Sequence, residues 1–104
     1  MRLPITFDHD KLADFCRRWK VSELAAFGSV LRDDFRADSD IDMIVGFSPD
    51  ADWSLLEHIA MQDELTAILG RRVDLVTRRA VERSRNWIRR KAILESVQPV
   101  YVAR

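Results

Sequence analysis

The sequence predicts a small α/β domain with a mixed β-sheet flanked by helices. Short aliphatic segments alternate along the chain with longer stretches whose apolar residues recur at helical spacing. Alternating strands and helices are typical of layered α/β architectures, and some connections are too short for a crossover helix, which favours a mixed sheet. With 104 residues, the chain is long enough for one hydrophobic core, so we expect a single domain over residues 1–104.

The composition is that of a globular protein and excludes several other classes. Lys and Arg number 17, Asp and Glu number 17, and 47% of the residues are hydrophobic, which argues against a disordered chain. Cys16 is the only cysteine, so an internal disulfide is excluded. The sequence has neither the apolar run of a signal peptide nor the ~20 apolar residues of a membrane span. We therefore expect a cytoplasmic protein with no membrane segment.

Charge is divided unequally along the chain. Residues 1–70 contain 7 Lys or Arg and 14 Asp or Glu, whereas residues 71–104 contain 10 and 3. Such asymmetry is typical of proteins with charged partners, but two oppositely charged parts of one fold also attract each other. The C-terminal arginines can therefore dock an acidic partner, contact nucleotide phosphates or form a solvated helix face.

The first two elements are expected to be a helix and a buried strand. Asp8 or Asp10 can cap a helix that runs to about Trp19. Its apolar residues recur at i, i+3, i+4 and i+7 and form one stripe, made by Leu12, Phe15, Cys16 and Trp19. Val21–Phe27 is apolar in its second half and ends at a glycine–serine pair, which predicts a strand that stops at a turn.

A second strand and a second helix are expected in the middle of the chain. Ile41–Phe47 has the aliphatic content of a central strand, although it contains a carboxylate. Asp52 or Ser54 can begin a helix that runs through Leu69, and Gly70 is placed to close it in a left-handed conformation.

The last third of the chain predicts a strand, one helix and an edge strand. Val73–Thr77 is aliphatic and again contains a carboxylate. The arginine-rich stretch around Val81–Val97 predicts a single helix. Pro99 then precedes a short edge strand over Val100–Val102, because proline is tolerated at sheet edges.

Three carboxylates stand where strands are normally apolar. Asp40 and Asp42 lie at the start of one strand and Asp74 lies inside another. Because strand side chains alternate, Asp40 and Asp42 project from the same face about 7 Å apart, and a neighbouring strand can bring Asp74 beside them. Mg²⁺ binds such carboxylates together with phosphate oxygens, so the pattern indicates a metal-bound nucleoside triphosphate. The alternative is that these acids cap turns or pair with arginines.

Gly28 and Ser29 form a candidate phosphate-binding turn. They follow a strand and precede Val30-Leu31-Arg32, which is expected to be a first helical turn. Free backbone N–H groups at such a helix start attract anions, glycine allows close approach of the backbone, and the serine hydroxyl is a further donor. The alternative is an ordinary turn glycine with a capping serine.

Taken together, these residues resemble a known family. Phe27-Gly28-Ser29 followed by Asp40-Ile41-Asp42-Met43, with a later strand aspartate at Asp74, resembles the signature of the DNA polymerase beta-type nucleotidyltransferase superfamily. With Arg32 and Ser39 also in place, the pattern is similar to its minimal nucleotidyltransferase (MNT) branch. The resemblance spans essentially the whole chain and implies the nucleotidyltransferase fold.

The resemblance also implies a chemistry and roles for these residues. An acceptor hydroxyl attacks the α-phosphate of a nucleoside triphosphate, expected to be ATP, and pyrophosphate leaves, with two Mg²⁺ ions bound. Asp40 and Asp42 hold the triphosphate-bound ion and bridge to the second, whose site Asp74 completes. The phosphates are held by Gly28 and Ser29. Arg32 either contacts them or pairs with a nearby aspartate, and Ser39 shapes the turn before the metal-binding strand.

The chain is too short for a separate acceptor-binding domain, so another molecule is expected to present the hydroxyl. MNT proteins are commonly paired with a small helical HEPN protein, an RNase toxin. The resemblance therefore implies an antitoxin that transfers AMP to a tyrosine of a HEPN toxin.

Other functions fit the same sequence. One is a binding module that neutralises its partner by occlusion, and another is a transferase acting on a small hydroxyl compound, for which a homodimer could form the acceptor cleft. Nucleic-acid polymerisation is disfavoured because the chain lacks a basic groove with interleaved aromatic residues.

Overall fold

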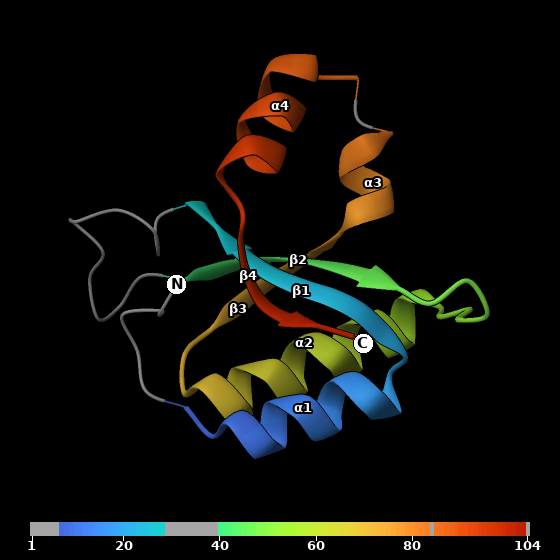
Figure 1. Ribbon diagram of the computed structural model, residues 1–104, viewed down its shortest axis with the longest axis vertical. Helices are drawn as coiled ribbons and strands as arrows, with labels where there is room; N and C mark the ends of the chain where they lie inside the picture. Colours follow the sequence, from blue (N-terminus) through green and yellow to red (C-terminus); the bar gives the residue numbers. More distant parts are fainter. Residues whose placement is uncertain (1–6, 29–39, 84, 104) are drawn as a thin grey trace.

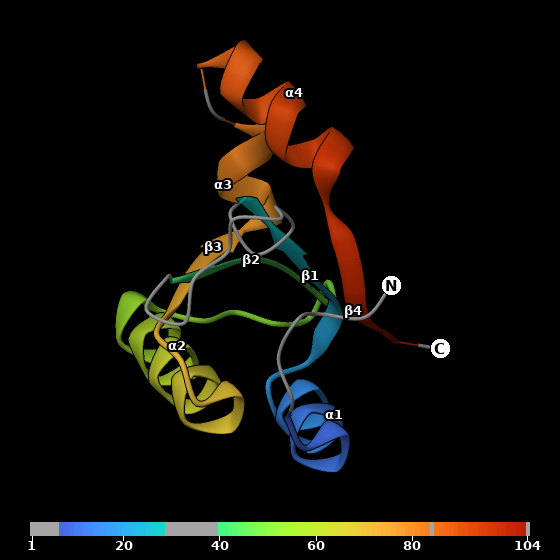
Figure 2. The ribbon, with the colours of Figure 1, turned by 90° about the vertical axis from the view of Figure 1, so that its left-hand side faces the viewer.

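The computed structural model of the chain describes residues 7–28, 40–83 and 85–103. Four strands form one sheet in the order β3-β2-β1-β4. Helices α1 and α2 cover one face, which we call the lower face, and α3 and α4 lie on the opposite, upper face (Figures 1 and 2). The elements are α1 (His9–Arg18), β1 (Val21–Phe27), β2 (Ile41–Phe47), α2 (Leu55–Leu69), β3 (Val73–Thr77), α3 (Arg78–Glu82), α4 (Trp87–Ser96) and β4 (Gln98–Val102).

The sheet is mixed, as the short connections predicted. β1 pairs antiparallel with β2 on one side and with β4 on the other, whereas β2 and β3 are parallel. The parallel pair is possible because α2 provides the long crossover between the two strands. β3 and β4 are therefore the edge strands, and β2 lies inside the sheet.

Capping residues define the boundaries of α1 and α2. Asp8, rather than Asp10, caps α1, because its carboxylate accepts hydrogen bonds from the backbone N–H groups of Asp10 (3.0 Å) and Lys11 (3.2 Å). Ser54 precedes α2, and its backbone N–H donates to the Glu57 carboxylate at 2.5 Å. Gly70 ends α2 with φ 70°, a left-handed conformation that glycine adopts without strain.

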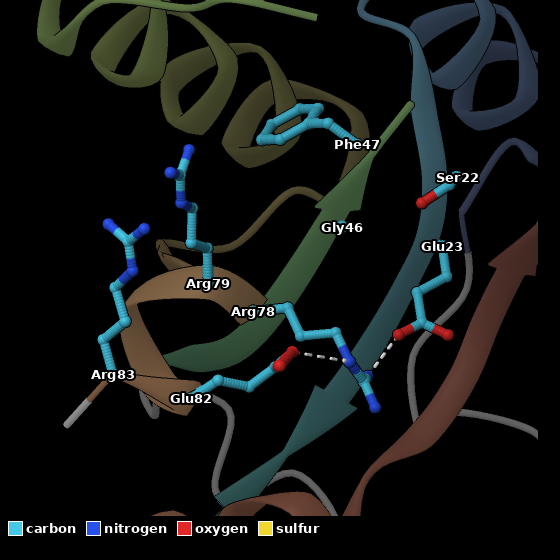
Figure 3. A pocket seen from close by; sticks show the side chains of 8 residues that line it. All are labelled: Ser22, Glu23, Gly46, Phe47, Arg78, Arg79, Glu82 and Arg83. Atoms are coloured by element: carbon cyan, nitrogen blue, oxygen red, sulfur yellow. Dashed lines mark hydrogen bonds and ion pairs between the residues drawn. The ribbon is translucent and has the colours of Figure 1, made fainter. Parts of the chain in front are cut away.

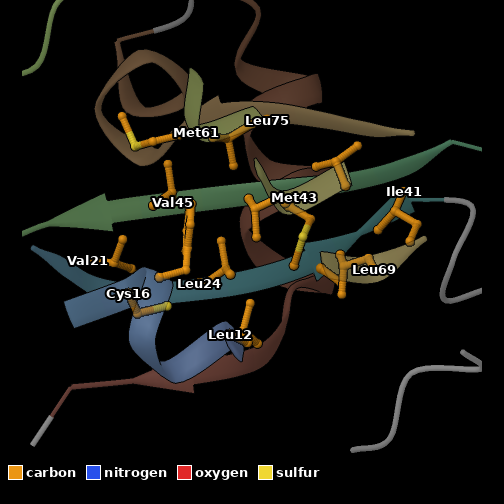
Figure 4. Packing of buried hydrophobic residues seen from close by; sticks show 14 residues of the cluster. Leu12, Cys16, Val21, Leu24, Ile41, Met43, Val45, Met61, Leu69 and Leu75 are labelled. Atoms are coloured by element: carbon orange, nitrogen blue, oxygen red, sulfur yellow. The ribbon is translucent and has the colours of Figure 1, made fainter. Parts of the chain in front are cut away.

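The main hydrophobic core lies between the lower face and helices α1 and α2 (Figure 4). The β2 residues Ile41, Met43 and Val45 are at most 1% exposed and alternate with residues that face the other way. A smaller cluster on the upper face joins Ile44 to Val81 of α3. Within the part of the chain that the structure describes, no buried residue is polar or charged.

The C-terminal third differs from the prediction of a single helix around Val81–Val97. Two helices are present, and α3 begins directly after β3 because the Thr77 hydroxyl accepts a hydrogen bond from the N–H of Ala80 at 3.1 Å. The sequence between α3 and α4 includes Ser and Asn, whose side chains compete with helical hydrogen bonds. Periodicity cannot detect this break in a stretch where arginines occupy every face.

Two further findings concern the edge strand β4 and the lengths of the helices. β4 begins before Pro99 rather than after it, so the proline lies within the edge strand. None of the helices among the described residues combines the length and apolar character needed to cross a membrane.

Candidate active site

Two of the predicted carboxylates are direct neighbours in the sheet. Asp42 on β2 is the register partner of Asp74 on β3, and its partner on the other side is Phe27 at the end of β1. The parallel ladder is anchored at this end by a hydrogen bond from the Ile41 N–H to the Arg72 carbonyl at 2.9 Å. Residues paired in register point to the same face, so the Asp42 and Asp74 side chains share one side of the sheet.

That side is the upper face. Asp42 alternates with Ile41 and Met43, both fully buried on the lower face, and Asp74 lies between Val73 and Leu75 of the same lower core. Asp42 is half-buried, and Asp74 is exposed. The two carboxylates therefore lie where a ligand can approach from solvent.

Gly28 is fitted closely against Asp42. It follows β1 directly and has φ 75°, a left-handed conformation that favours glycine. A Cβ atom added to Gly28 would lie 2.5 Å from Oδ2 of Asp42, closer than non-bonded atoms can approach. The backbone conformation thus favours glycine at position 28, and any larger residue would force the Asp42 carboxylate to shift. We call Gly28, Asp42 and Asp74 the carboxylate end of the upper face.

Of the remaining predicted site residues, only Asp40 lies within the described part of the chain. Asp40 is exposed and immediately precedes β2. Ser29, Arg32 and Ser39 lie outside the described residues. In the ranges 7–28, 40–83 and 85–103, no group of three or more His, Cys, Asp or Glu residues is arranged to hold a metal ion.

The donors at the carboxylate end nevertheless fit Mg²⁺. This ion prefers oxygen ligands and is usually bound through one or two carboxylates plus substrate phosphates and water. The pairing of Asp42 with Asp74 supplies two such carboxylates from neighbouring strands. Gly28 keeps the space beside the Asp42 oxygen free of a side chain.

The histidines and two of the tryptophans have local structural contacts. The His58 ring nitrogen Nε2 lies 2.7 Å from the Leu75 carbonyl oxygen at the sheet edge, and the His9 ring packs against Phe7. Trp19 and Trp53 form an edge-to-face pair with ring centroids 5.2 Å apart. None of these three contacts involves the carboxylate end.

The sequence analysis missed one arrangement of charged residues on the upper face. Arg78, at the start of α3, forms ion pairs with Glu23 of β1 and with Glu82. The arginine-rich composition pointed to Arg78, but nothing local indicates Glu23, which is 55 residues away in sequence. The missing signal was the strand order, which places β1 within reach of α3.

Comparison with known proteins agrees with this fold. A family model described as a nucleotidyltransferase domain matches residues 10–100. The protein adenylyltransferase MntA of Thermococcus cleftensis is 40% identical over 65 residues, which are 62% of this chain. The alignment spans 64% of that relative's own length.

Solved structures share the same architecture. One assigned to a minimal nucleotidyltransferase has a TM-score of 0.66 at 30% identity and covers 88% of each chain. A crystal structure of a toxin–antitoxin with AMP-PNP has a TM-score of 0.68 at 20% identity, covering 93% of this chain and 75% of that chain. The match over residues 10–100 includes Gly28 and all three predicted carboxylates, and the chain belongs to the nucleotidyltransferase domain family.

Proposed function

We propose that the chain is a Mg²⁺-dependent protein adenylyltransferase that transfers AMP from ATP to a tyrosine hydroxyl of a HEPN-type RNase toxin, for which it is the antitoxin. The observation that carries this proposal is the pairing of Asp42 with Asp74, together with the fit of Gly28 against Asp42. Paired carboxylates beside a glycine turn are suited to a metal-bound triphosphate.

The names of related proteins support the acceptor and the partner. The relative from Thermococcus cleftensis is named a protein adenylyltransferase. Proteins with the same fold have been solved as MntA-HepT toxin–antitoxin complexes, with a TM-score of 0.60 at 20% identity for one of them, and a toxin–antitoxin was solved with AMP-PNP.

Each residue of the site has a role in this reaction. Gly28 and Ser29 hold the β- and γ-phosphates, and Arg32 adds positive charge beside them, while Ser39 shapes the turn that leads to Asp40. Asp40, Asp42 and Asp74 would hold the Mg²⁺ ions, the first two carboxylates on the side of the triphosphate and Asp74 on the side of the acceptor. When bound, the two ions stabilise the attacking and leaving oxygens.

The bond changes are those of an in-line displacement. The tyrosine oxygen, oriented by Asp74, forms a bond to the α-phosphorus while the bond from that phosphorus to the pyrophosphate oxygen breaks. The hydroxyl proton passes through Asp74 to water, and pyrophosphate leaves. The product is a phosphodiester between tyrosine and AMP.

Intact-mass spectrometry of the helical protein encoded beside this chain tests the proposal. After incubation with the chain, ATP and Mg²⁺, we expect AMP adducts on the partner. The double variant Asp40→Asn/Asp42→Asn should form none. The matched control Asp52→Asn/Asp63→Asn removes two exposed carboxylates elsewhere and should remain active. A partner that co-purifies, is neutralised and yet stays unmodified would replace the transferase with an occluding binding module.

A further inference from the structure

A recess lies on the upper face, away from the carboxylate end. It has a volume of about 400 Å³ and lies between β1, β2 and α3 (Figure 3). Gly46 at its floor comes four residues after Asp42 on the same strand, which is roughly 13 Å along β2. We call it the arginine pocket and define it by Glu23, Gly46, Arg78, Arg79, Glu82 and Arg83.

One of the three arginines is already neutralised within the fold. The Arg78 guanidinium forms ion pairs with Glu23 and with Glu82, the latter at 3.4 Å, and Figure 3 shows its side chain held between the two carboxylates. Gly46 lies beside this side chain, and a Cβ added there would meet Arg78 Cδ at 4.0 Å, an ordinary van der Waals distance. Arg78 is therefore held in place by two carboxylates and forms one side of the pocket.

The other two arginines are not neutralised in this way. Arg79 and Arg83 are both exposed, and they lie one helical turn apart, where like charges repel. Among the residues that the structure describes, neither forms an ion pair with a carboxylate. In Figure 3 both side chains extend away from the ion pair between Arg78 and Glu23. The pocket thus presents two guanidinium groups that an anion can bridge.

We propose that the arginine pocket binds an acidic segment of a partner protein, with a carboxylate side chain bridging Arg79 and Arg83. Guanidinium groups match carboxylates in a bidentate geometry. The segment 71–104, with 10 Lys or Arg and 3 Asp or Glu, adds a positive field that accelerates association with acidic surfaces. This binding is independent of nucleotide transfer, because the pocket contains none of the residues assigned to that chemistry.

The carboxylates of the pocket favour a protein over a nucleic acid. Glu23 and Glu82 line the same recess, and they repel a nucleic acid, whose negative charge repeats at every phosphate along the backbone. A peptide carries its charges on separate side chains, so it can place one carboxylate on Arg79 and Arg83 and keep others away from Glu23 and Glu82.

The test measures binding of a fluorescein-labelled peptide, in which four glutamates are each separated by two serines, to the full chain by anisotropy at low and physiological salt. We expect salt-sensitive binding that is weakened about tenfold or more in Arg79→Glu/Arg83→Glu. The control Arg85→Glu/Lys91→Glu makes the same change in net charge at exposed positions outside the pocket and should weaken binding much less. Circular dichroism verifies that both variants are folded.

Three results would overturn the proposal. The first is no binding of the peptide at low salt. The second is equal weakening by the control variant, which would mean that overall charge, and not the pocket, attracts the peptide. The third is an eight-nucleotide oligouridylate that binds more tightly than the peptide and is lost in Arg79→Glu/Arg83→Glu, which would assign the pocket to nucleic acid.

Discussion

The two faces of the sheet differ in what the same strands present to them. On the lower face, alternate residues of β2 are buried against α1 and α2, with at most 1% exposure. On the upper face the intervening residues are Asp42, Ile44 and Gly46, and only Ile44 is buried. β2 therefore contributes apolar side chains to the core on the lower face. On the upper face it contributes to the carboxylate end and to the arginine pocket, which are separated by a small apolar cluster.

In this small domain, the apolar residues that stabilise the fold and the charged residues lie mostly on opposite faces of the sheet. Burying apolar surface stabilises the fold by about 25 cal/mol per Å², and here most of that surface lies on the lower face. Charged groups on the upper face remain near solvent, where ions and ligands can reach them. Gly28 at one end of this face makes room for the Asp42 carboxylate, because a Cβ there would lie 2.5 Å from Oδ2.

The largest effect is expected at the carboxylate end, from Gly28→Ala. A Cβ at this position would displace the Asp42 carboxylate, and a shift of about 1 Å in a catalytic group can lower a rate about 100-fold. The left-handed backbone adds strain of about 1–3 kcal/mol. We expect AMP transfer to fall about 100-fold, measured by intact mass of the partner over time.

Gly70→Ala is the matched control for that variant. Gly70 has nearly the same φ, 70° against 75°, but an added Cβ meets nothing within 4 Å. It should lower the free energy of unfolding by about 1 kcal/mol and leave transfer unchanged. Equal transfer rates in the two variants would contradict the role given to the contact between Gly28 and Asp42.

The second-largest effect is expected for Cys16, which is buried in the core on the lower face. It tests whether water is excluded from that core. Burial raises the pKa of this thiol to about 12 from an ordinary value of 9.0, because the thiolate is poorly solvated there. The unfolded chain ionises near pH 9, whereas the folded protein does not until near pH 12. Stability from the neutral thiol is therefore complete below pH 9 and is lost as pH rises towards 12.

The measurement is urea unfolding of the unmodified chain and of Cys16→Ala at several pH values from 8 to 10.5. The difference in free energy of unfolding between them should be constant below about pH 9 and then fall by about 1.4 kcal/mol per pH unit. A difference that stays constant across this range would mean that Cys16 is solvated in the folded protein.

The difference between the lower and upper faces also explains how much could be predicted from the sequence. The strands Val21–Phe27, Ile41–Phe47 and Val73–Thr77 have the predicted bounds, because buried segments carry a strong apolar signal. At the site, strand alternation predicted that Asp40 and Asp42 share one face, and it left open whether a neighbouring strand brings Asp74 beside them. The register that makes them direct partners is a property of the folded sheet and could not be derived from either strand alone.

The features that the sequence did not predict lie mostly on the upper face. The boundary between α3 and α4 falls in a stretch without a clear apolar period, and the partner of Arg78 is a distant residue, Glu23. Ion pairs of this kind depend on tertiary proximity rather than on local pattern. The roles of Ser29, Arg32 and Ser39 remain predictions from the family resemblance.

A smaller effect is expected from the ion pair between Glu23 and Arg78. A double-mutant cycle with Glu23→Gln and Arg78→Ala should give a coupling energy of up to about 1 kcal/mol, because both side chains are more than a third exposed and water screens the pair. The Glu23 side chain is at 34% exposure and that of Arg78 at 39%. AMP transfer should not change, since the pair is remote from Asp42. A coupling near zero would show that the two side chains do not interact in solution.

The smallest effect is expected from Gly46→Ala, the counterpart of Gly28→Ala at the other end of the upper face. Its added Cβ would lie 3.2 Å from the Ser22 hydroxyl and 4.0 Å from Arg78 Cδ, which is crowded but can be relieved by small side-chain shifts. Alanine is also favoured over glycine inside a strand by about 0.5–1 kcal/mol. The two contributions should nearly cancel, leaving the free energy of unfolding within about 0.5 kcal/mol in urea titrations. A loss well above about 1 kcal/mol would mean that Ser22 cannot move, and that the backbone beside Gly46 is as tightly fitted as the carboxylate end.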